Sequence, residues 1–298
     1  MTQTTKMTAD REFAEMIIQR LEAGTTPWQR GWSINEALAK PFHNCVSGGE
    51  YHGANIFRLF FATEIKGYTD NRWMTYKQAQ EKGWQVRKGE KGVHVSFYKA
   101  YKPEGAEDED EDSTVSRTRY AVKVYTVFNA SQIEGVPAIP EPDTYEWNPI
   151  EIGERILANS GAVIEHKVTA NGCSYIPSAD IIELPPKEQF LDAAEYYAAA
   201  LHELAHWTGA ARRLDRGLTT NHVKGEYARE ELRAEIASWM ISAATGLPFK
   251  PESHAAYVNG WIQAIKRDYR EIFRACADAE RIKDYILGFI PKSDEKAA

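Results

Sequence analysis

Two histidines and a glutamate in the second half of the chain have the spacing of a metal-dependent hydrolytic site. They lie in Leu201-His-Glu-Leu-Ala-His206, where His202 and His206 are four residues apart. On a helix this spacing places both imidazoles on one face, so that they can hold one metal ion. Glu203 lies beside them and is predicted to be the general base that takes a proton from a metal-bound water. Zinc suits such ligands and lowers the pKa of its water to about 7; another divalent ion such as manganese would also fit.

A third ligand is expected on a helix about 25 residues further along the chain, where Glu230, Glu231 and Glu235 occur. Glu231 and Glu235 are four residues apart, so both can face the metal. One can bind it while the other accepts a hydrogen bond from a histidine ring nitrogen. The spacing resembles the gluzincin pattern of a ligand glutamate followed four residues later by a supporting acid. On that resemblance Glu231 is expected to be the ligand and Glu235 the support or alternative third ligand, with Glu230 facing away.

The helices that carry these side chains are expected at 187–208 and 227–245. The first contains the apolar run Ala198–Leu201 and ends near Gly209, a pattern typical of a buried helix. Two histidines on the surface of an amphipathic helix are the alternative to a metal site. A buried helix followed by an acidic one favours the metal site.

One strand and three side chains could complete an active site. The strand predicted within 174–184 precedes the histidine helix, and in zincins an edge strand there can pair with an extended peptide. An ordinary sheet strand is the alternative. Tyr227, His254 and Tyr257 are candidates to stabilise an oxyanion, although side chains of these types more often serve packing or lie on the surface.

The remaining pattern predicts an α+β protein of two domains, residues 1–134 and 150–298, joined by a proline-rich linker over 135–149. Helices are expected at 10–23, 53–64, 76–82, 150–160, 254–268 and 273–287, and strands at 94–99, 119–128 and 162–166. Asp10 is the expected N-cap of the first helix and Gly24 its stop. The acidic stretch 104–112 is expected to be an exposed hairpin loop; imitation of a nucleic-acid backbone is the alternative.

Composition limits the class of protein. Of the 298 residues, 43% are hydrophobic and 27% charged, as in a globular protein. There is no apolar run of eighteen residues, so no membrane span is expected, and the polar start lacks a signal peptide's apolar stretch, which favours the cytoplasm. Three separated cysteines argue against a disulfide framework. The net charge of −7 combines +5 over residues 1–102 with −4 over 103–129 and −8 from 130 onward.

The basic first domain interleaves aromatic and cationic residues, a combination that binds single-stranded nucleic acid by base stacking and phosphate contacts. The alternative is that the aromatics form the core and the cations an ordinary surface. The candidate DNA-binding residues are Trp28, Arg30, Trp32, Tyr51, Asn55, Trp73, Tyr76, Lys77, Arg87, Lys88 and Lys91.

Several segments together resemble one family. Pro27-Trp28, Trp32, Tyr51-His-Gly-Ala-Asn55, Trp73-Met-Thr-Tyr76, Gly83 and Val86-Arg-Lys-Gly-Glu-Lys-Gly92 resemble the amino-terminal domain of the ArdC-type antirestriction proteins, which also begins plasmid TraC-type primases. His202-Glu-Leu-Ala-His-Trp-Thr-Gly209 and Tyr227-Ala-Arg-Glu-Glu-Leu-Arg-Ala-Glu235 resemble the zincin-like peptidase segment of that family. The resemblance covers nearly the whole chain except the acidic stretch and the two tails.

The resemblance implies a plasmid-borne protein whose front domain binds single-stranded DNA and which shields incoming DNA from the restriction enzymes of the recipient. It also implies an intact metallopeptidase site, for which host restriction subunits are a candidate target. Two other interpretations remain open: a DNA-binding protection module whose metal site is structural, and an accessory of a primase-like system. The second has less support because no nucleotide-transfer carboxylate motif occurs.

Overall fold

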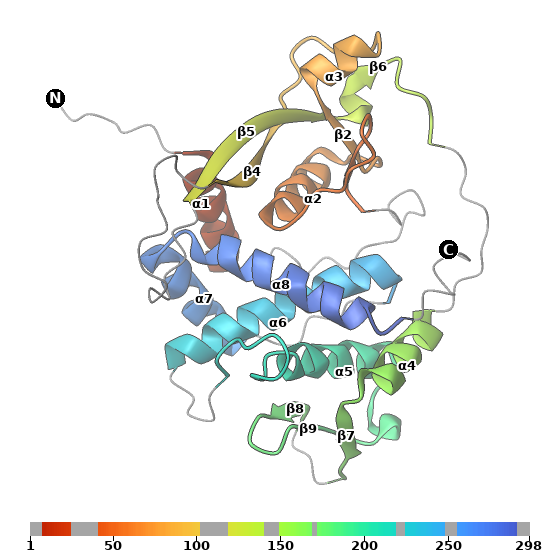
Figure 1. Cartoon of the computed structure of the whole chain (residues 1–298), viewed down its shortest axis with the longest axis vertical. Coiled ribbons are helices and arrows are strands. Elements are labelled where there is room, and N and C mark those ends of the chain that lie inside the picture. The colour runs from red at the N-terminus through yellow and green to blue at the C-terminus, as the bar shows by residue number, and fades with distance from the viewer. Residues whose placement is uncertain are drawn as a thin grey trace, which may run out of the picture. The chain divides into compact units, whose positions relative to one another are not determined.

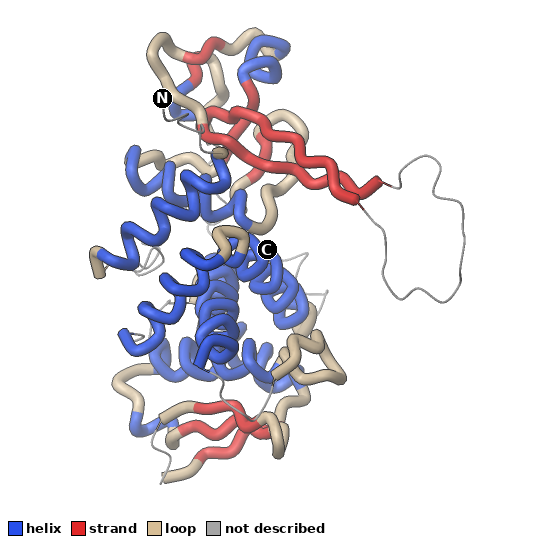
Figure 2. Tube along the Cα trace, turned by 90° about the vertical axis from the view of Figure 1, so that its left-hand side faces the viewer, coloured by secondary structure: helices blue, strands red, loops and turns tan. Residues whose placement is uncertain are grey.

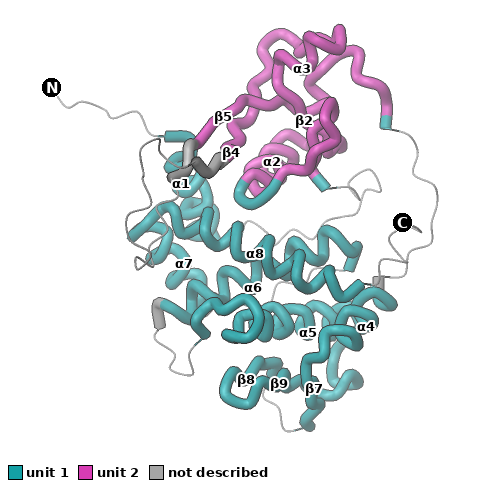
Figure 3. The backbone as a smooth tube through the Cα atoms, viewed as in Figure 1, with its two compact units in different colours: residues 1–41, 52–54, 139–298 teal, residues 42–51, 55–138 magenta. Residues whose placement is uncertain are grey.

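The computed structural model describes residues 8–24, 41–101, 119–139, 149–168, 172–218, 224–247 and 255–290. The chain divides into two compact units (Figure 3). Unit 1 comprises residues 1–41, 52–54 and 139–298, and unit 2 comprises residues 42–51 and 55–138. Helices and sheets occur in both, so the predicted α+β class with two domains is confirmed. Among the described residues no helix is long and apolar enough to cross a membrane.

Unit 2 is built on a four-stranded sheet of order β1-β2-β5-β4. Its strands are β1 (His43–Asn44), β2 (Arg72–Thr75), β4 (Val93–Tyr101) and β5 (Arg119–Asn129). β1 and β2 are parallel and the other pairs antiparallel. β4 and β5 pair from Val93 opposite Val127 to Tyr101 opposite Arg119, forming the long two-stranded ribbon seen in Figure 2. A second, smaller sheet pairs β3 (Gln85–Val86) with β6 (Ile133–Glu134).

Two helices complete unit 2, α2 (Ala54–Lys66) and α3 (Tyr76–Glu81). α2 is fixed to β4 because the Asn55 side chain donates to the Ser96 carbonyl and accepts from the Ser96 N–H, both at 2.9 Å. α3 begins at a capping box in which the Thr75 hydroxyl accepts from the Gln78 N–H. The largest fully buried side chains here are Phe57, Leu59, Phe61, Trp73 and Met74.

Unit 1 contains a three-stranded sheet of order β7-β9-β8, formed by Val163–His166, Ile181–Leu184 and Ser174–Ile176 respectively. The single strand predicted within 174–184 is therefore wrong: the segment is a hairpin of β8 and β9. The chain reverses at Asp180, whose φ is +55°, and the Asp180 N–H donates to the Ile176 carbonyl at 2.8 Å. Aspartate tolerates this left-handed backbone better than most residues, so a turn signal was present in the sequence.

The helices of unit 1 are α1 (Ala9–Glu22), α4 (Pro149–Ser160), α5 (Ala193–Trp207), α6 (Lys224–Thr245), α7 (Ala255–Arg267) and α8 (Glu271–Leu287). α6 packs against α5, α7 and α8 (Figure 1). It is buried on several sides, with Leu232, Ala234, Ile236, Ala237 and Trp239 fully inaccessible. A helix enclosed in this way has no single apolar stripe.

Three local details differ from the expectations. The helix predicted from 187 starts at Ala193, because Asp192 caps it by accepting from the Glu195 N–H at 2.8 Å. A short 3₁₀ turn (Lys187–Gln189) precedes it. The N-cap of α1 is Thr8 and not Asp10. α1 packs against α7 within unit 1. The predicted domains, 1–134 and 150–298 with a linker at 135–149, remain a prediction.

Candidate metal centre

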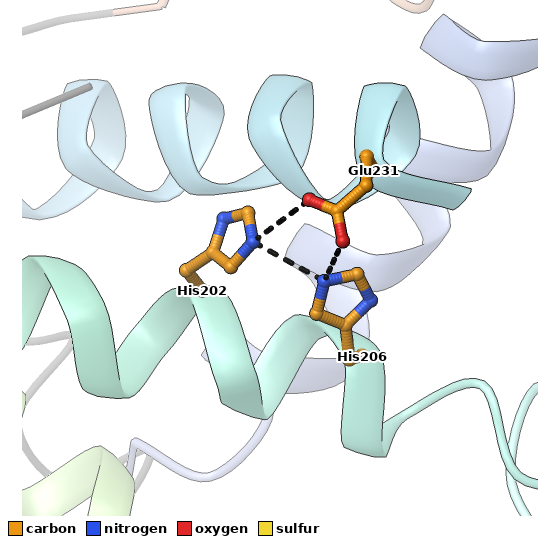
Figure 4. A group of neighbouring side chains, drawn as sticks. All are labelled: His202, His206 and Glu231. Carbon is orange, nitrogen blue, oxygen red and sulfur yellow. Dashed lines mark hydrogen bonds and ion pairs between the residues drawn. The ribbon is translucent and has the colours of Figure 1, made fainter. Parts of the chain in front are cut away.

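Two helices bring the predicted ligands together. α5 supplies His202 and His206, and α6 supplies Glu231 (Figure 4). The small side chains of Ala199, Ala200 and Ala205 are buried on α5. Small residues such as these let neighbouring elements approach closely, so the packing of α5 against α6 determines where the three side chains meet.

The donor atoms of these three residues all lie within 4.8 Å of one another. The Nε2 atoms of His202 and His206 are 3.2 Å apart. Glu231 Oε2 lies 3.5 Å from His202 Nε2, and its Oε1 lies 3.4 Å from His206 Nε2. The side chains are only 7%, 10% and 4% exposed for His202, His206 and Glu231. Two imidazole nitrogens and one carboxylate around a common point are the protein ligands of a catalytic divalent metal site.

Each histidine has a second carboxylate behind it. His202 Nδ1 lies 3.8 Å from Glu235 Oε2, and His206 Nδ1 lies 3.3 Å from Glu230 Oε1. Such partners fix the ring orientation and leave Nε2 for the metal. Glu235 therefore has the predicted supporting position. The expectation that Glu230 faces away is wrong, because it is buried and supports His206.

Arg216 is a component of the site that no sequence pattern indicated. Its guanidinium donates to Glu230 Oε1 at 2.5 Å and to Oε2 at 3.1 Å. It also donates to the Thr208 hydroxyl at 2.7 Å and to the Ala205 carbonyl at 2.8 Å, at the end of α5. A single arginine in a loop has no spacing signal, because its role depends on the path that the chain takes after Gly209.

The protonation states of the cluster are coupled. Burial alone would lower the pKa of His206, but the carboxylates of Glu230 and Glu231 raise it well above its ordinary value. Burial would raise the pKa of Glu231, yet hydrogen bonds from His202 and His206 hold it far below its usual range. An ionised carboxylate and two imidazoles can together bind a divalent cation, which displaces the protons that the imidazoles share with the carboxylate.

The cluster opens into a cavity of about 1010 Å³, which Glu203 also lines. Tyr227 and Tyr257 border the same cavity, with ring centroids 5.5 Å apart. Burial raises the pKa of Tyr227 and the neighbouring Glu231 raises it further, so its hydroxyl keeps its proton and can donate a hydrogen bond. His254, the other oxyanion candidate, lies outside the described residues.

The edge strand β8 forms one wall of this cavity. Ser174, Tyr175 and Ile176 all line it. β8 lies at the end of the β7-β9-β8 order, whereas β9, the strand nearest to α5 in the sequence, is central. An edge strand beside the histidine helix can add an extended peptide by main-chain hydrogen bonds.

The predicted DNA-binding residues divide into three groups. Trp28, Arg30 and Trp32 lie outside the described residues, as does the acidic stretch 104–112. Tyr51, Asn55 and Trp73 are buried in unit 2, where Tyr51 also lines a small cavity, and a DNA-binding role for them stays a prediction. Tyr76, Lys77, Arg87, Lys88 and Lys91 are exposed on unit 2.

Two family models match the chain in succession. The N-terminal domain of anti-restriction factor ArdC matches residues 7–128, and the zincin-like metallopeptidase matches residues 151–278. The second range contains the whole histidine and glutamate cluster.

Curated relatives include two proteins named DNA primase TraC from Escherichia coli. Both are 43% identical, over 290 and 293 residues, and each match covers 94% of this chain. The chain spans only 20% and 27% of their lengths. An uncharacterized protein, y4eC of Sinorhizobium fredii, is 36% identical over 273 residues, which are 91% of this chain and 88% of that protein.

Solved structures of the antirestriction ArdC protein from plasmid R388 share the fold over almost the full length. The metal-free structure has a TM-score of 0.76 and 35% identity, covering 95% of this chain and 98% of that one. The Mn(II)-bound structure has a TM-score of 0.79 and 34% identity, covering 96% and 99%. With both family models matched in order and a relative of similar length throughout, this chain belongs to the ArdC-type antirestriction proteins.

Proposed function

We propose that this protein protects incoming plasmid DNA from restriction, by binding single-stranded DNA through unit 2 and by a zinc-dependent peptidase activity in unit 1. The observation that carries the peptidase part is the arrangement of Nε2 of His202, Nε2 of His206 and the Glu231 carboxylate around one point. The carboxylates behind both rings support a metal role for these histidines, since a pair used only for packing has no need of them.

Each residue of the site has a task in this proposal. His202, His206 and Glu231 hold the cation, with zinc the proposed ion and manganese a second that the same donors accept. When bound, the cation supplies Lewis acidity that makes a water more acidic and a peptide carbonyl more electrophilic. Glu203, which lines the cavity, takes the proton of the attacking water and passes it to the leaving amine. The Tyr227 hydroxyl donates to the developing oxyanion.

The proposed substrate is an extended peptide segment. β8 offers main-chain groups along one wall of the cavity, and a paired peptide would run past the cluster. Subunits of the host restriction enzymes in the cytoplasm are the proposed source of that segment. Incubation of such subunits with the protein and zinc should yield fragments; subunits that stay intact at long times would overturn this assignment.

The experiment for the proposed function is plasmid transfer into a restricting host, comparing the wild type with Glu203→Gln. The expected result is loss of protection, with metal content and DNA binding retained, because only the general base is removed. Glu203→Gln is close to isosteric, so it preserves packing around the buried side chain. Full protection by this variant would contradict the peptidase part of the proposal.

The alternative is a DNA-binding protection module whose metal site is structural. The exposed cations Arg87, Lys88 and Lys91 favour it, because they gather within five residues of unit 2. It predicts that charge reversal at these three positions abolishes protection while Glu203→Gln has no effect. The proposed function predicts loss in both cases.

A further inference from the structure

Two aromatic side chains are exposed next to each other on the sheet of unit 2. Phe97 on β4 is 45% exposed and Tyr125 on β5 is 43% exposed. Their ring centroids are 5.6 Å apart with an interplanar angle of 78°. In the β4–β5 ladder Tyr125 is opposite Val95 and Phe97 is opposite Lys123, so these side chains share one face. Two exposed aromatic rings in contact on one face of a sheet form a candidate binding surface.

The two rings border a cavity of about 500 Å³. Tyr51 lies against them, with its ring centroid 6.4 Å from that of Phe97. The amides of Asn44 and Gln78 also line the cavity, and Asn44 Nδ2 donates to Gln78 Oε1 at 3.1 Å. Because these polar groups hold one another, the cavity has a fixed shape with amide groups close to its aromatic side.

A lysine lies beside the aromatic pair. Lys123 is exposed, lines the cavity and lies directly opposite Phe97. Glu50 is the acidic residue in the lining. Over the described residues 42–51, 55–101 and 119–138, unit 2 has 11 lysines and arginines against 6 aspartates and glutamates, a net charge of +5. The acidic stretch 104–112 belongs to the same unit, so the whole of unit 2 has 13 basic and 13 acidic residues. Flat apolar rings beside a cation match a ligand with flat rings and a negative backbone.

We propose that Phe97, Tyr125 and Lys123 form a base-stacking site for single-stranded DNA. A base stacks on the aromatic pair, and the adjacent phosphate pairs with the Lys123 ammonium. A duplex is a poor fit, since its bases are stacked on one another and cannot reach the rings. The inference rests on the DNA binding proposed above and locates it at residues that the sequence analysis did not select. Tyr51, which it did select, supports the site from beneath.

The test is fluorescence anisotropy of a short labelled oligothymidine with the full chain. Phe97→Ala and Tyr125→Ala should each weaken binding by about 5- to 150-fold, the range expected for loss of one stacked base. Tyr125→Phe should keep the affinity because the ring remains. Lys123→Ala should weaken binding less and make the salt dependence shallower by about 0.7 in the logarithmic slope.

Val124→Ala is the matched control. Val124 is 53% exposed on the same strand, and strand alternation points it to the opposite face from Tyr125. The oligothymidine affinity of Val124→Ala should equal that of the wild type. Thermal unfolding of each variant shows whether the fold is kept. As a second readout, an oligonucleotide with abasic positions should bind the wild type more weakly than the intact oligonucleotide does. In Phe97→Ala the intact and abasic oligonucleotides should bind with nearly equal affinity, because the stacking ring is already absent.

The possible results distinguish a failure of the stacking site from a failure of the DNA binding proposed above. A wild type that does not bind oligothymidine would overturn both the DNA binding and the site. A wild type that binds, with both alanine variants within twofold of it, would overturn the site alone. Binding would then belong to another surface of the protein, such as that of Arg87, Lys88 and Lys91.

Discussion

At the scale of single residues, the metal centre depends on a chain of contacts that starts outside the ligand set. Arg216 holds Glu230 through two hydrogen bonds, and Glu230 in turn faces Nδ1 of His206. The Arg216 and Glu230 side chains are 8% and 9% exposed. A buried carboxylate without its arginine partner lowers the stability of the fold, so we expect Arg216 to affect both stability and metal binding.

Arg216→Met should therefore weaken metal binding by about 10- to 100-fold, the usual effect of disturbing a partner of a ligand. It should also reduce the free energy of unfolding by about 3–5 kcal/mol. A chelator competition titration and denaturant unfolding measure the two effects. Arg212→Met is the control, because Arg212 is in the same loop but its side chain is 66% exposed. Equal behaviour of the two variants would count against the role of Arg216.

The raised pKa of His206 predicts a coupling between protons and metal. Glu230 and Glu231 favour the protonated ring, whereas a metal ligand must be neutral. Below the raised pKa of His206, metal binding must displace a proton, so the apparent affinity should increase with pH and level off once the pH exceeds that pKa. In the metal-free protein the folding stability changes with pH in the opposite direction. The stability that the charged His206 ring contributes is complete below the ordinary pKa of about 6.5 and is lost as the pH rises through the raised pKa of the folded protein.

Calorimetric titration of the metal in buffers of different ionisation enthalpy measures this proton release. At neutral pH the wild type should release a proton from His206, and Glu230→Gln should release less, because it removes a carboxylate that raises the pKa. A heat of metal binding that is the same in every buffer would mean that no proton is released, and would contradict the coupling between protonation of His206 and metal binding.

At the scale of elements, the sequence predicted most of what positions the site. The periodic apolar residues of α7 and α8 and the alternation of β4 and β5 are strong local signals, whereas α6, buried on several sides, has no single apolar stripe. The four-residue spacing within α5 indicated the two histidines, and the spacing within α6 left Glu231 and Glu235 as candidates, of which the gluzincin resemblance selected Glu231. The hairpin of β8 and β9 was missed, because a short apolar run interrupted by Pro177 and Asp180 can be read as one strand or two.

The orientation of Glu230 could not be predicted from spacing alone. Glu230 and Glu231 are neighbours on α6, about 100° apart around the helix axis, so ordinarily one of them points away from a given partner. Both serve the site because α5 presents its two histidines one turn apart. Glu231 lies between their Nε2 atoms, and Glu230 reaches the far side of His206. That arrangement depends on how the two helices pack, which is a long-range property.

Close packing of helices around α6 gives a prediction at this scale. A Cβ added to Gly260 on α7 would lie 2.7 Å from the Cβ of Ala228 on α6. Gly260→Ala should therefore destabilise unit 1 by about 1–3 kcal/mol, although alanine is the better helix former. Thermal unfolding measures it. Asn259→Ala, at the exposed neighbouring position, is the control and should be neutral or stabilising. An increase in stability for Gly260→Ala would show that α6 and α7 pack less closely.

At the scale of the whole molecule, the uneven charge predicts which partner each part of the chain attracts. Residues 1–102 carry +5 and residues from 130 onward −8. An overall charge of −7 would argue against DNA binding if it were spread evenly, so the proposed binding requires a local basic surface.

Oligothymidine affinity should thus fall steeply with salt, and Lys88→Glu with Lys91→Glu should reduce the slope by about 1.4 if both side chains contact phosphates. Anisotropy titrations over a range of salt concentrations measure this slope. Lys167→Glu, an exposed change in unit 1, is the control and should leave it unchanged. An unaltered slope in the double variant would place the phosphate contacts elsewhere.

We predict that His202, His206 and Glu231 together hold one divalent metal ion. The most direct test is the zinc content of stripped and reloaded protein after removal of free metal. The wild type and Glu203→Gln should each bind one ion per chain, because Glu203 is not a ligand. His206→Ala and Glu231→Ala should bind almost none while staying folded by circular dichroism. A wild type without stoichiometric zinc, or ligand variants that retain it, would contradict the claim.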